Sequence, residues 1–181
     1  MRLYRQTVQD YGLYAGCELT DEQLASLRTD AGAMSAKMRA VRIVAASNVS
    51  RRDLEDRLVQ KGEDPAQAKE AVQWMQELNL VDDSQTARQV VSRCAARGYG
   101  INRARQALYE KKIPKAYWDD VLADYPDQSE HILAFLRQRI DTDSDSREVK
   151  RAIDTLIRRG HNYSDIRKAL VKLSADEFLE E

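Results

Sequence analysis

The sequence has few of the residues that mark turn-rich, disulfide-bonded or membrane-spanning proteins. Its 181 residues include only three prolines and seven glycines, too few for a β-sandwich with many tight turns. The two cysteines, Cys17 and Cys94, have no second cysteine or histidine at ligand spacing, which argues against a disulfide framework and a zinc site. The apolar runs, such as residues 132–136, are far shorter than the roughly 18 residues that span a bilayer.

Patterns for secretion, cofactor binding and catalysis are also missing. The N-terminus lacks the apolar segment of a signal peptide, so we expect a cytoplasmic protein. The Gly98-Tyr99-Gly100 run follows a predicted helix and lacks the third glycine and the lysine of nucleotide-binding loops. His131 and His161 have no partner at metal-ligand spacing, and we expect both to be structural. The sequence therefore predicts no enzyme, no cofactor and no metal.

Helical patterning fills most of the chain. Hydrophobic residues make up 43%, which is enough for a core, although 33% of the residues are charged. Capping patterns at Thr20–Gln23 and Asp64-Pro65 precede apolar residues at helical spacing, and no segment alternates as a strand does. We predict an all-α fold in which Gly32 splits one long stretch into two helices and residues 174–177 cap a separate last turn.

An internal repeat is visible at a spacing of 62 residues, where 97–108 matches 159–170 in its Arg-Gly pair and in its Arg-x-Ala-Leu run. A fainter copy lies about 50 residues earlier. We expect such units to need their neighbours to bury their apolar stripes, which predicts an elongated, curved array of three-helix repeats. The predicted boundaries are a partly helical flank at 1–33, a first repeat at 34–81, a second at 82–126, and a linking helix with the third repeat at 127–181.

Charge is strongly segregated, although the net charge is only −1. Residues 88–115 hold eight basic side chains against one acidic, and residues 147–172 hold eight against three; residues 116–146 between them are acidic. Arginine outnumbers lysine 20 to 9, and its fork suits phosphates and carboxylates. Two basic segments separated by an acidic one favour a binding surface over scattered solubilising charge. The candidate partner-binding residues are Arg93, Arg97, Tyr99, Arg103, Arg105, Lys111, Lys112, Arg151, Arg158, Arg159, Arg167 and Lys168.

The run 93–100, RCAARGYG, followed by RARQAL at 103–108 and KKIP at 111–114, resembles the RecX family of regulatory proteins. Residues 50–62 resemble the first family repeat and residues 157–170 the third. The sequence departs from the family pattern at Thr86, where an aromatic is usual, and at Ile101, where a proline is common. We expect Asn102 to cap the following helix in place of that proline. Asn162 replaces Gly100 in the third unit, which left-handed backbone would tolerate.

The resemblance implies a helical array that lies along the groove of the RecA recombinase filament. It also implies inhibition of strand exchange, of ATP hydrolysis and of filament-stimulated repressor cleavage during the SOS response, and some family members bind DNA. We expect a monomer whose two basic patches bridge filament subunits. The alternative is a helix-turn-helix-like, non-specific module for single- or double-stranded DNA, with Tyr99 and Tyr163 stacking on bases. The isoelectric point of this chain, about 6.2, is low for a dedicated DNA-binding protein. A third alternative is a structural adaptor.

Overall fold

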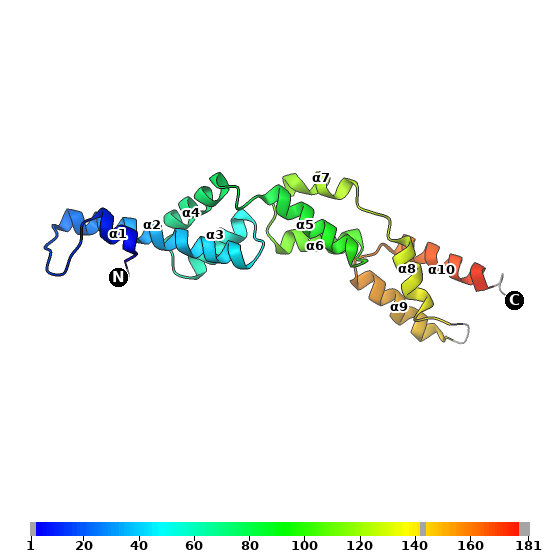
Figure 1. Cartoon of the computed structure of the whole chain (residues 1–181). Helices are drawn as coiled ribbons and strands as arrows, with labels where there is room; N and C mark the ends of the chain where they lie inside the picture. Colours follow the sequence, from blue (N-terminus) through cyan, green and yellow to red (C-terminus); the bar gives the residue numbers. More distant parts are fainter. Residues whose placement is uncertain (1–2, 142–143, 178–181) are drawn as a thin grey trace. The chain divides into compact units, whose positions relative to one another are not determined.

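The computed structural model describes residues 3–141 and 144–177, and every element of regular structure in these ranges is helical (Figure 1). The all-α prediction is confirmed. The chain divides into two units, residues 1–86 and 87–181. The elements are α1 (Arg5–Asp10), α2 (Asp21–Ala46), α3 (Arg51–Gln60), α4 (Pro65–Glu77), α5 (Asp83–Ala96), α6 (Ile101–Glu110), the 3-10 turn η1 (Lys115–Tyr117), α7 (Trp118–Ala123), α8 (Ser129–Arg137), α9 (Ser146–Arg158) and α10 (Tyr163–Glu177).

The core of the first unit lies between α2, α3 and α4. The capping box predicted at Thr20 is present: its hydroxyl accepts from the Gln23 backbone N–H, and the Gln23 side chain accepts from the Thr20 N–H. Asp64 caps α4 in front of Pro65, as predicted. The fully buried core side chains come from all three helices: Ala36, Ala40, Leu54, Leu58, Ala68, Ala71 and Met75.

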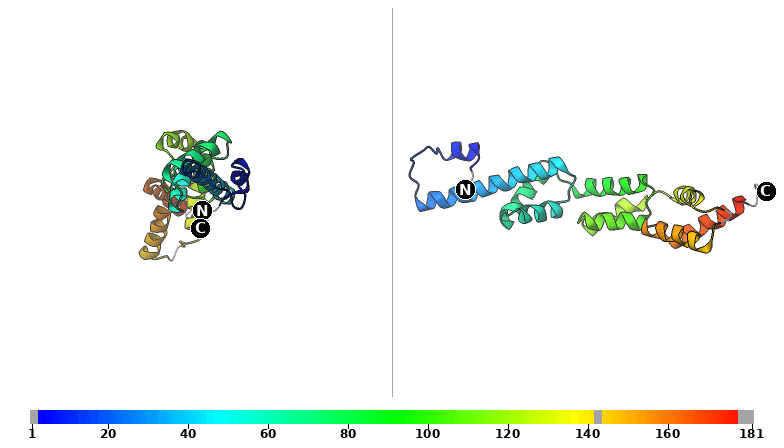
Figure 2. Two further views of the ribbon diagram at one scale, coloured as in Figure 1. Left: turned by 90° about the vertical axis from the view of Figure 1, so that its left-hand side faces the viewer. Right: turned by 90° about the horizontal axis from the view of Figure 1, so that it is seen from below.

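Helix α2 is continuous across Gly32, so the predicted break there is wrong (Figure 2). A Cβ atom at Gly32 would lie 2.4 Å from the side-chain oxygen of Gln67. The Gln67 amide instead lies against the helix and donates to the Thr29 carbonyl at 3.2 Å. This glycine therefore permits close packing of α4 on α2, and its backbone remains helical.

The second unit contains two separate cores. Helices α5, α6 and α7 enclose one of them, which includes Val91, Leu108 and Leu122. Helices α8, α9 and α10 enclose the other, around Leu136 and Leu156 (Figure 1). Each three-helix group thus buries its own apolar stripe, contrary to our expectation that neighbouring units must supply the cover. Three helices give each stripe two partners, which is sufficient to exclude water.

Helix α10 continues from Tyr163 to Glu177, so the separate last turn predicted at 174–177 is also wrong. The Ser174 hydroxyl donates to the Leu170 carbonyl at 3.1 Å, as a serine inside a helix does. Within the described ranges, no helix is both long and apolar enough to cross a membrane. The predicted flank and repeat boundaries stay a prediction.

Candidate binding surface

Two interhelical turns of the second unit, residues 97–100 and 159–162, are bonded to each other. The Gly100 N–H donates to the Arg159 carbonyl at 3.0 Å, and the Asn102 N–H donates to the Gly160 carbonyl at 3.2 Å. His161 Nε2 lies 3.0 Å from the Gly98 carbonyl oxygen, which can only accept, so Nε2 carries the proton. We call this contact the turn junction. It joins the α5–α7 group directly to the α8–α10 group.

Glycines allow the turn junction in two different ways. Gly98 and Gly160 have φ of 65° and 88°, left-handed values that favour glycine just past a helix end. Gly100 has an ordinary φ of −75°, but a Cβ there would lie 2.1 Å from the Gly160 carbonyl oxygen. Asn162 is not among the described residues with positive φ. The left-handed backbone expected at Gly100 and Asn162 is therefore wrong, because close approach of two backbones is what requires Gly100.

Asn102 links the two turns and does not cap α6. The helix begins at Ile101 with Gly100 as its N-cap residue, and no side chain caps it. The Asn102 amide instead donates to the Asn162 side-chain oxygen at 2.9 Å and accepts from Arg105 at 3.2 Å. The capping role expected for Asn102 is wrong, because its partner is 60 residues away.

Both histidines have structural positions. His161 is buried at 6% exposure, and this burial lowers its pKa, with the hydrogen bond to Gly98 opposing the shift and the charge of Arg159 adding to it. The His131 ring packs against Gly98, where a Cβ would lie 2.7 Å from the ring. Among the described residues, no cluster of three His, Cys, Asp or Glu side chains is arranged to hold a metal ion.

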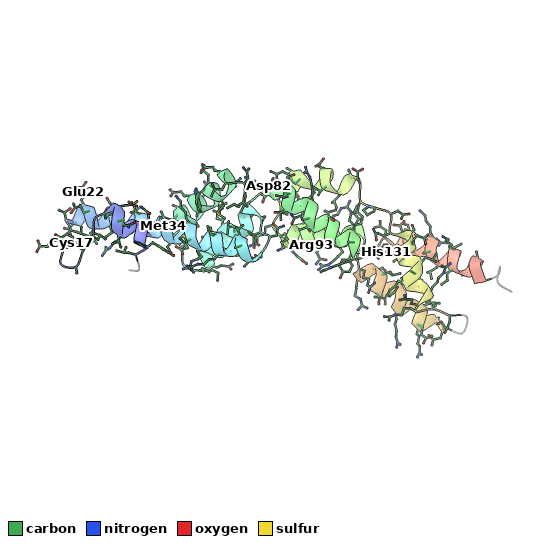
Figure 3. All side chains as sticks on the ribbon, in the orientation of Figure 1. Cys17, Glu22, Met34, Asp82, Arg93 and His131 are labelled. Atoms are coloured by element: carbon green, nitrogen blue, oxygen red, sulfur yellow. The ribbon has the colours of Figure 1, made fainter. Side chains whose placement is uncertain are left out.

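The candidate residues in and next to α5 and α6 differ in their solvent exposure and in their contacts with other side chains. Arg93 and Arg97 are exposed. Arg93 is labelled on α5 in Figure 3. Arg103 is half-buried and pairs with Glu110 at 3.0 Å. Tyr99 packs against the α5–α7 core, and its carbonyl accepts from the Tyr125 hydroxyl at 2.7 Å. Its ring is therefore only partly available for stacking on a base. The remaining candidates here are exposed Arg105 and half-buried Lys111 and Lys112.

The candidate residues of α9 and α10 are all exposed: Arg151, Arg158, Arg159, Arg167 and Lys168. Arg158 donates to the Thr155 hydroxyl at 3.2 Å, and Lys168 lies 3.9 Å from Asp165. The Arg159 guanidinium lies over the Phe135 ring, 4.7 Å from its centre. The turn junction brings Arg159 close to the start of α6, because the Arg159 carbonyl accepts from the Gly100 N–H.

Arg139 is a basic neighbour of this surface that the sequence reasoning missed. Its guanidinium lies 5.4 Å from the centre of the same Phe135 ring. It belongs to the segment 116–146, whose net charge is negative, so averaging charge over the segment hid it. The four-residue spacing from Phe135 to Arg139 is the signal that identifies such a pair in a helical segment.

Comparison with known proteins places this geometry in context. No family model matches the chain. The regulatory protein RecX of Halorhodospira halophila (strain DSM 244 / SL1) is 29% identical over 154 residues, covering 82% of this chain and 96% of its own. The regulatory protein RecX of Clostridioides difficile (strain 630) is 24% identical over 183 residues, covering 97% and 86%.

Solved structures give the same result for the fold. A crystal structure of regulatory protein RecX superimposes with a TM-score of 0.72 at 18% identity, covering 92% of this chain and 87% of the other. The crystal structure of RecX from Lactobacillus salivarius gives 0.69 at 19% identity, covering 80% and 97%. The resemblance to the RecX family that the sequence motifs predict is therefore confirmed, by similarity over most of the chain and by the fold.

Proposed function

We propose that this protein binds the RecA recombinase filament in the cytoplasm and inhibits its recombinase, ATPase and coprotease activities. The similar proteins are named regulatory proteins, which supports a regulatory role. The protein acts by binding and not by catalysis, and it needs no cofactor. Its contacts are made by the basic residues of α5, α6, α9 and α10 together with Tyr99.

The turn junction is the observation that carries this proposal. Two backbone hydrogen bonds and the bond from the His161 side chain to the Gly98 carbonyl join residues 97–102 to residues 159–161 and hold the two basic segments at a fixed spacing. Two linked weak contacts raise avidity by roughly 10²–10⁴ when their spacing matches the target. A rigid link also lowers the entropy lost on binding. Fixed spacing therefore suits a target with a regular subunit repeat, such as a filament.

The direct test measures ATP hydrolysis by RecA on single-stranded DNA. We expect hydrolysis to slow at substoichiometric amounts of this protein, because one bridging molecule restrains more than one subunit. Strand exchange and repressor cleavage should fall in parallel. Hydrolysis that is unchanged at an equimolar ratio contradicts the proposal.

Paired substitutions test the two segments. Arg97→Ala with Arg105→Ala should weaken inhibition at least tenfold, about 1.4 kcal/mol, an ordinary loss for interfacial arginines. Arg159→Ala with Arg167→Ala should do the same, because bridging requires both segments. Arg28→Ala, an exposed arginine outside both segments, is the control. If either double variant folds by circular dichroism and inhibits like the parent, the two-patch mechanism is wrong.

A second candidate function is direct, non-specific DNA binding. Arg93, Arg97 and Arg167 are exposed and form no ion pair within the part of the chain that the structure describes, which favours this alternative. If DNA phosphates are the main partner, log affinity for free single strands falls with log salt by about 0.7 per phosphate neutralised. A filament regulator should bind naked DNA weakly and hold the RecA–DNA filament at the same ionic strength. Equal affinity for both favours the DNA-binding module.

A further inference from the structure

Helices α6 and α10 carry the same pattern of side chains at the same positions. Each helix begins three residues after a glycine in the left-handed conformation, Gly98 or Gly160. In both helices the first, fifth and ninth residues are an apolar side chain, an arginine and a second apolar side chain. Residues four apart lie on one face of a helix, so each triplet forms a strip along its helix. We call these the anchor strips: Ile101, Arg105 and Tyr109 on α6, and Tyr163, Arg167 and Val171 on α10.

The anchor strips face solvent. Tyr109, Tyr163 and Val171 are 72%, 61% and 64% exposed, and both arginines are exposed as well. Ile101 is half-buried and packs against the α5–α7 core. In the part of the chain that the structure describes, four large hydrophobic side chains are more than 60% exposed, and three of the four belong to the anchor strips. Exposed apolar side chains gathered at equivalent positions indicate an interaction surface, whereas scattered single ones do not.

Local structure does not require these apolar side chains. Valine and tyrosine are weaker helix formers than alanine or lysine, so Val171, inside α10 and mostly exposed, costs helix stability and buries little. Helix α4 also begins three residues after a left-handed glycine, Gly62, and its fifth and ninth residues are the exposed Lys69 and Gln73. A helix in the same place of the first unit therefore has polar residues where α6 and α10 have Arg-apolar pairs.

The turn junction links the two anchor strips. The Asn102 side chain donates to the Asn162 side-chain oxygen at 2.9 Å and accepts from the Arg105 guanidinium at 3.2 Å. Helices α6 and α10 therefore begin side by side, and from there they run apart (Figures 1 and 2). Two strips of the same design held by one junction suit a partner that presents the same surface twice.

We propose that the two anchor strips bind equivalent surfaces on neighbouring protein subunits of the filament, each surface a carboxylate set among apolar side chains. This inference rests on the proposed function, which supplies the repeating partner. An arginine fork pairs with a carboxylate, and tyrosine and arginine are the residues that dominate the energy of protein–protein contacts. A phosphate backbone would pair with the two arginines but would leave Val171 and Ile101 without a partner. The anchor strips therefore fit a protein surface better than DNA.

Co-sedimentation of the full-length protein with RecA filaments on single-stranded DNA, at two salt concentrations, tests the strips. We expect Tyr109→Ser and Val171→Ser each to weaken filament binding by about tenfold. The salt dependence should stay that of the parent, because an apolar contact releases no counterions. Tyr14→Ser and Val59→Ser, at an exposed tyrosine and an exposed valine outside the strips, are the matched controls and should bind like the parent.

An exchange variant tests whether the two strips are equivalent. Tyr109→Val combined with Val171→Tyr moves each side chain to the other strip, and we expect it to keep the filament affinity of the parent. Exchange that weakens binding as much as the serine variants refutes the equivalence of the two surfaces.

The two levels of the argument fail in different ways. A parent protein that does not bind the filament refutes the proposed function. Serine variants that bind the filament like the parent refute the anchor strips alone, and so does an equal loss of affinity for free single-stranded DNA, which would assign the strips to bases. Circular dichroism confirms folding of each variant, which we expect because the substituted side chains are exposed.

Discussion

Substituting Gly100 by alanine tests whether the turn junction holds the two groups of the second unit together. At most sites with ordinary φ, a Gly→Ala change stabilises a protein by about 0.4–1 kcal/mol, because the unfolded chain loses freedom. Gly100 has φ of −75°, so alanine fits its backbone. The added Cβ would nevertheless meet the Gly160 carbonyl oxygen at 2.1 Å and the His161 nitrogen at 2.3 Å. Both are main-chain atoms, so the turns must separate.

The expected loss follows from the bonds that separation breaks. They are the Gly100–Arg159 and Asn102–Gly160 main-chain bonds and the His161–Gly98 bond. Each contributes a net ~0.5–1.5 kcal/mol, so we expect Gly100→Ala to lower the free energy of unfolding by about 2–4 kcal/mol. The sign is opposite to that of an ordinary Gly→Ala change, which makes the result easy to interpret.

Urea unfolding followed by circular dichroism at 222 nm gives the free energy of unfolding. Hydrogen exchange gives the protection of the Asn102 backbone N–H, which donates to the Gly160 carbonyl. Gly32→Ala is the matched control, because the nearest atoms there belong to the flexible end of the Gln67 side chain. Alanine at position 32 gains about 1 kcal/mol in helix propensity, which offsets the loss of the hydrogen bond from Gln67 to the Thr29 carbonyl. We therefore expect the stability of Gly32→Ala to stay close to that of the parent. If Gly100→Ala is as stable as the parent and its Asn102 backbone N–H stays protected, the close approach of the two backbones is not what requires glycine at position 100.

Two further substitutions test buried polar groups. Burial lowers the pKa of His161 from its ordinary 6.5, so the unfolded chain binds the proton more readily and stability present above pH 6.5 is lost as the pH falls below it. His161→Gln should flatten that loss in urea unfolding between pH 7 and 5; an unchanged slope contradicts the assignment. Asp83, which is buried, accepts from the Arg51 backbone and guanidinium at 2.9 Å each, so Asp83→Asn should lower stability by about 1–3 kcal/mol at pH 7. Thermal unfolding with Arg51→Gln as the companion variant checks this, and additive losses would show that the two side chains do not interact.

The sequence predicted what depends on neighbours along the chain. The caps at Thr20 and Asp64 act within three residues, so their patterns identified where α2 and α4 begin. Gly32 and Asn102 were misread because their partners, Gln67 and Asn162, lie tens of residues away. Long-range packing therefore decided the positions at which local rules failed.

The candidate surface shows the same division. Segment charge identified basic side chains such as Arg97 and Arg167, which the structure leaves exposed. It did not show that the two turns bond to each other, because a backbone N–H bonded to a distant carbonyl has no residue-type signal. Arg139 was missed because the net charge of its segment is negative, whereas its place beside the surface follows from its contact with the Phe135 ring.

The turn junction has a consequence for the symmetry and length of the array. It pairs two copies of the same element, because the 97–100 turn corresponds to the 159–162 turn at the spacing of 62 residues. The backbone bonds are not reciprocal, because Gly100 and Asn102 of one copy donate them and Arg159 and Gly160 of the next copy accept them. A contact in which the two copies play different parts is head-to-tail, and head-to-tail contacts can be extended without end. Growth of the protein by tandem duplication of the coding sequence would therefore reuse the kind of contact that joins these two copies.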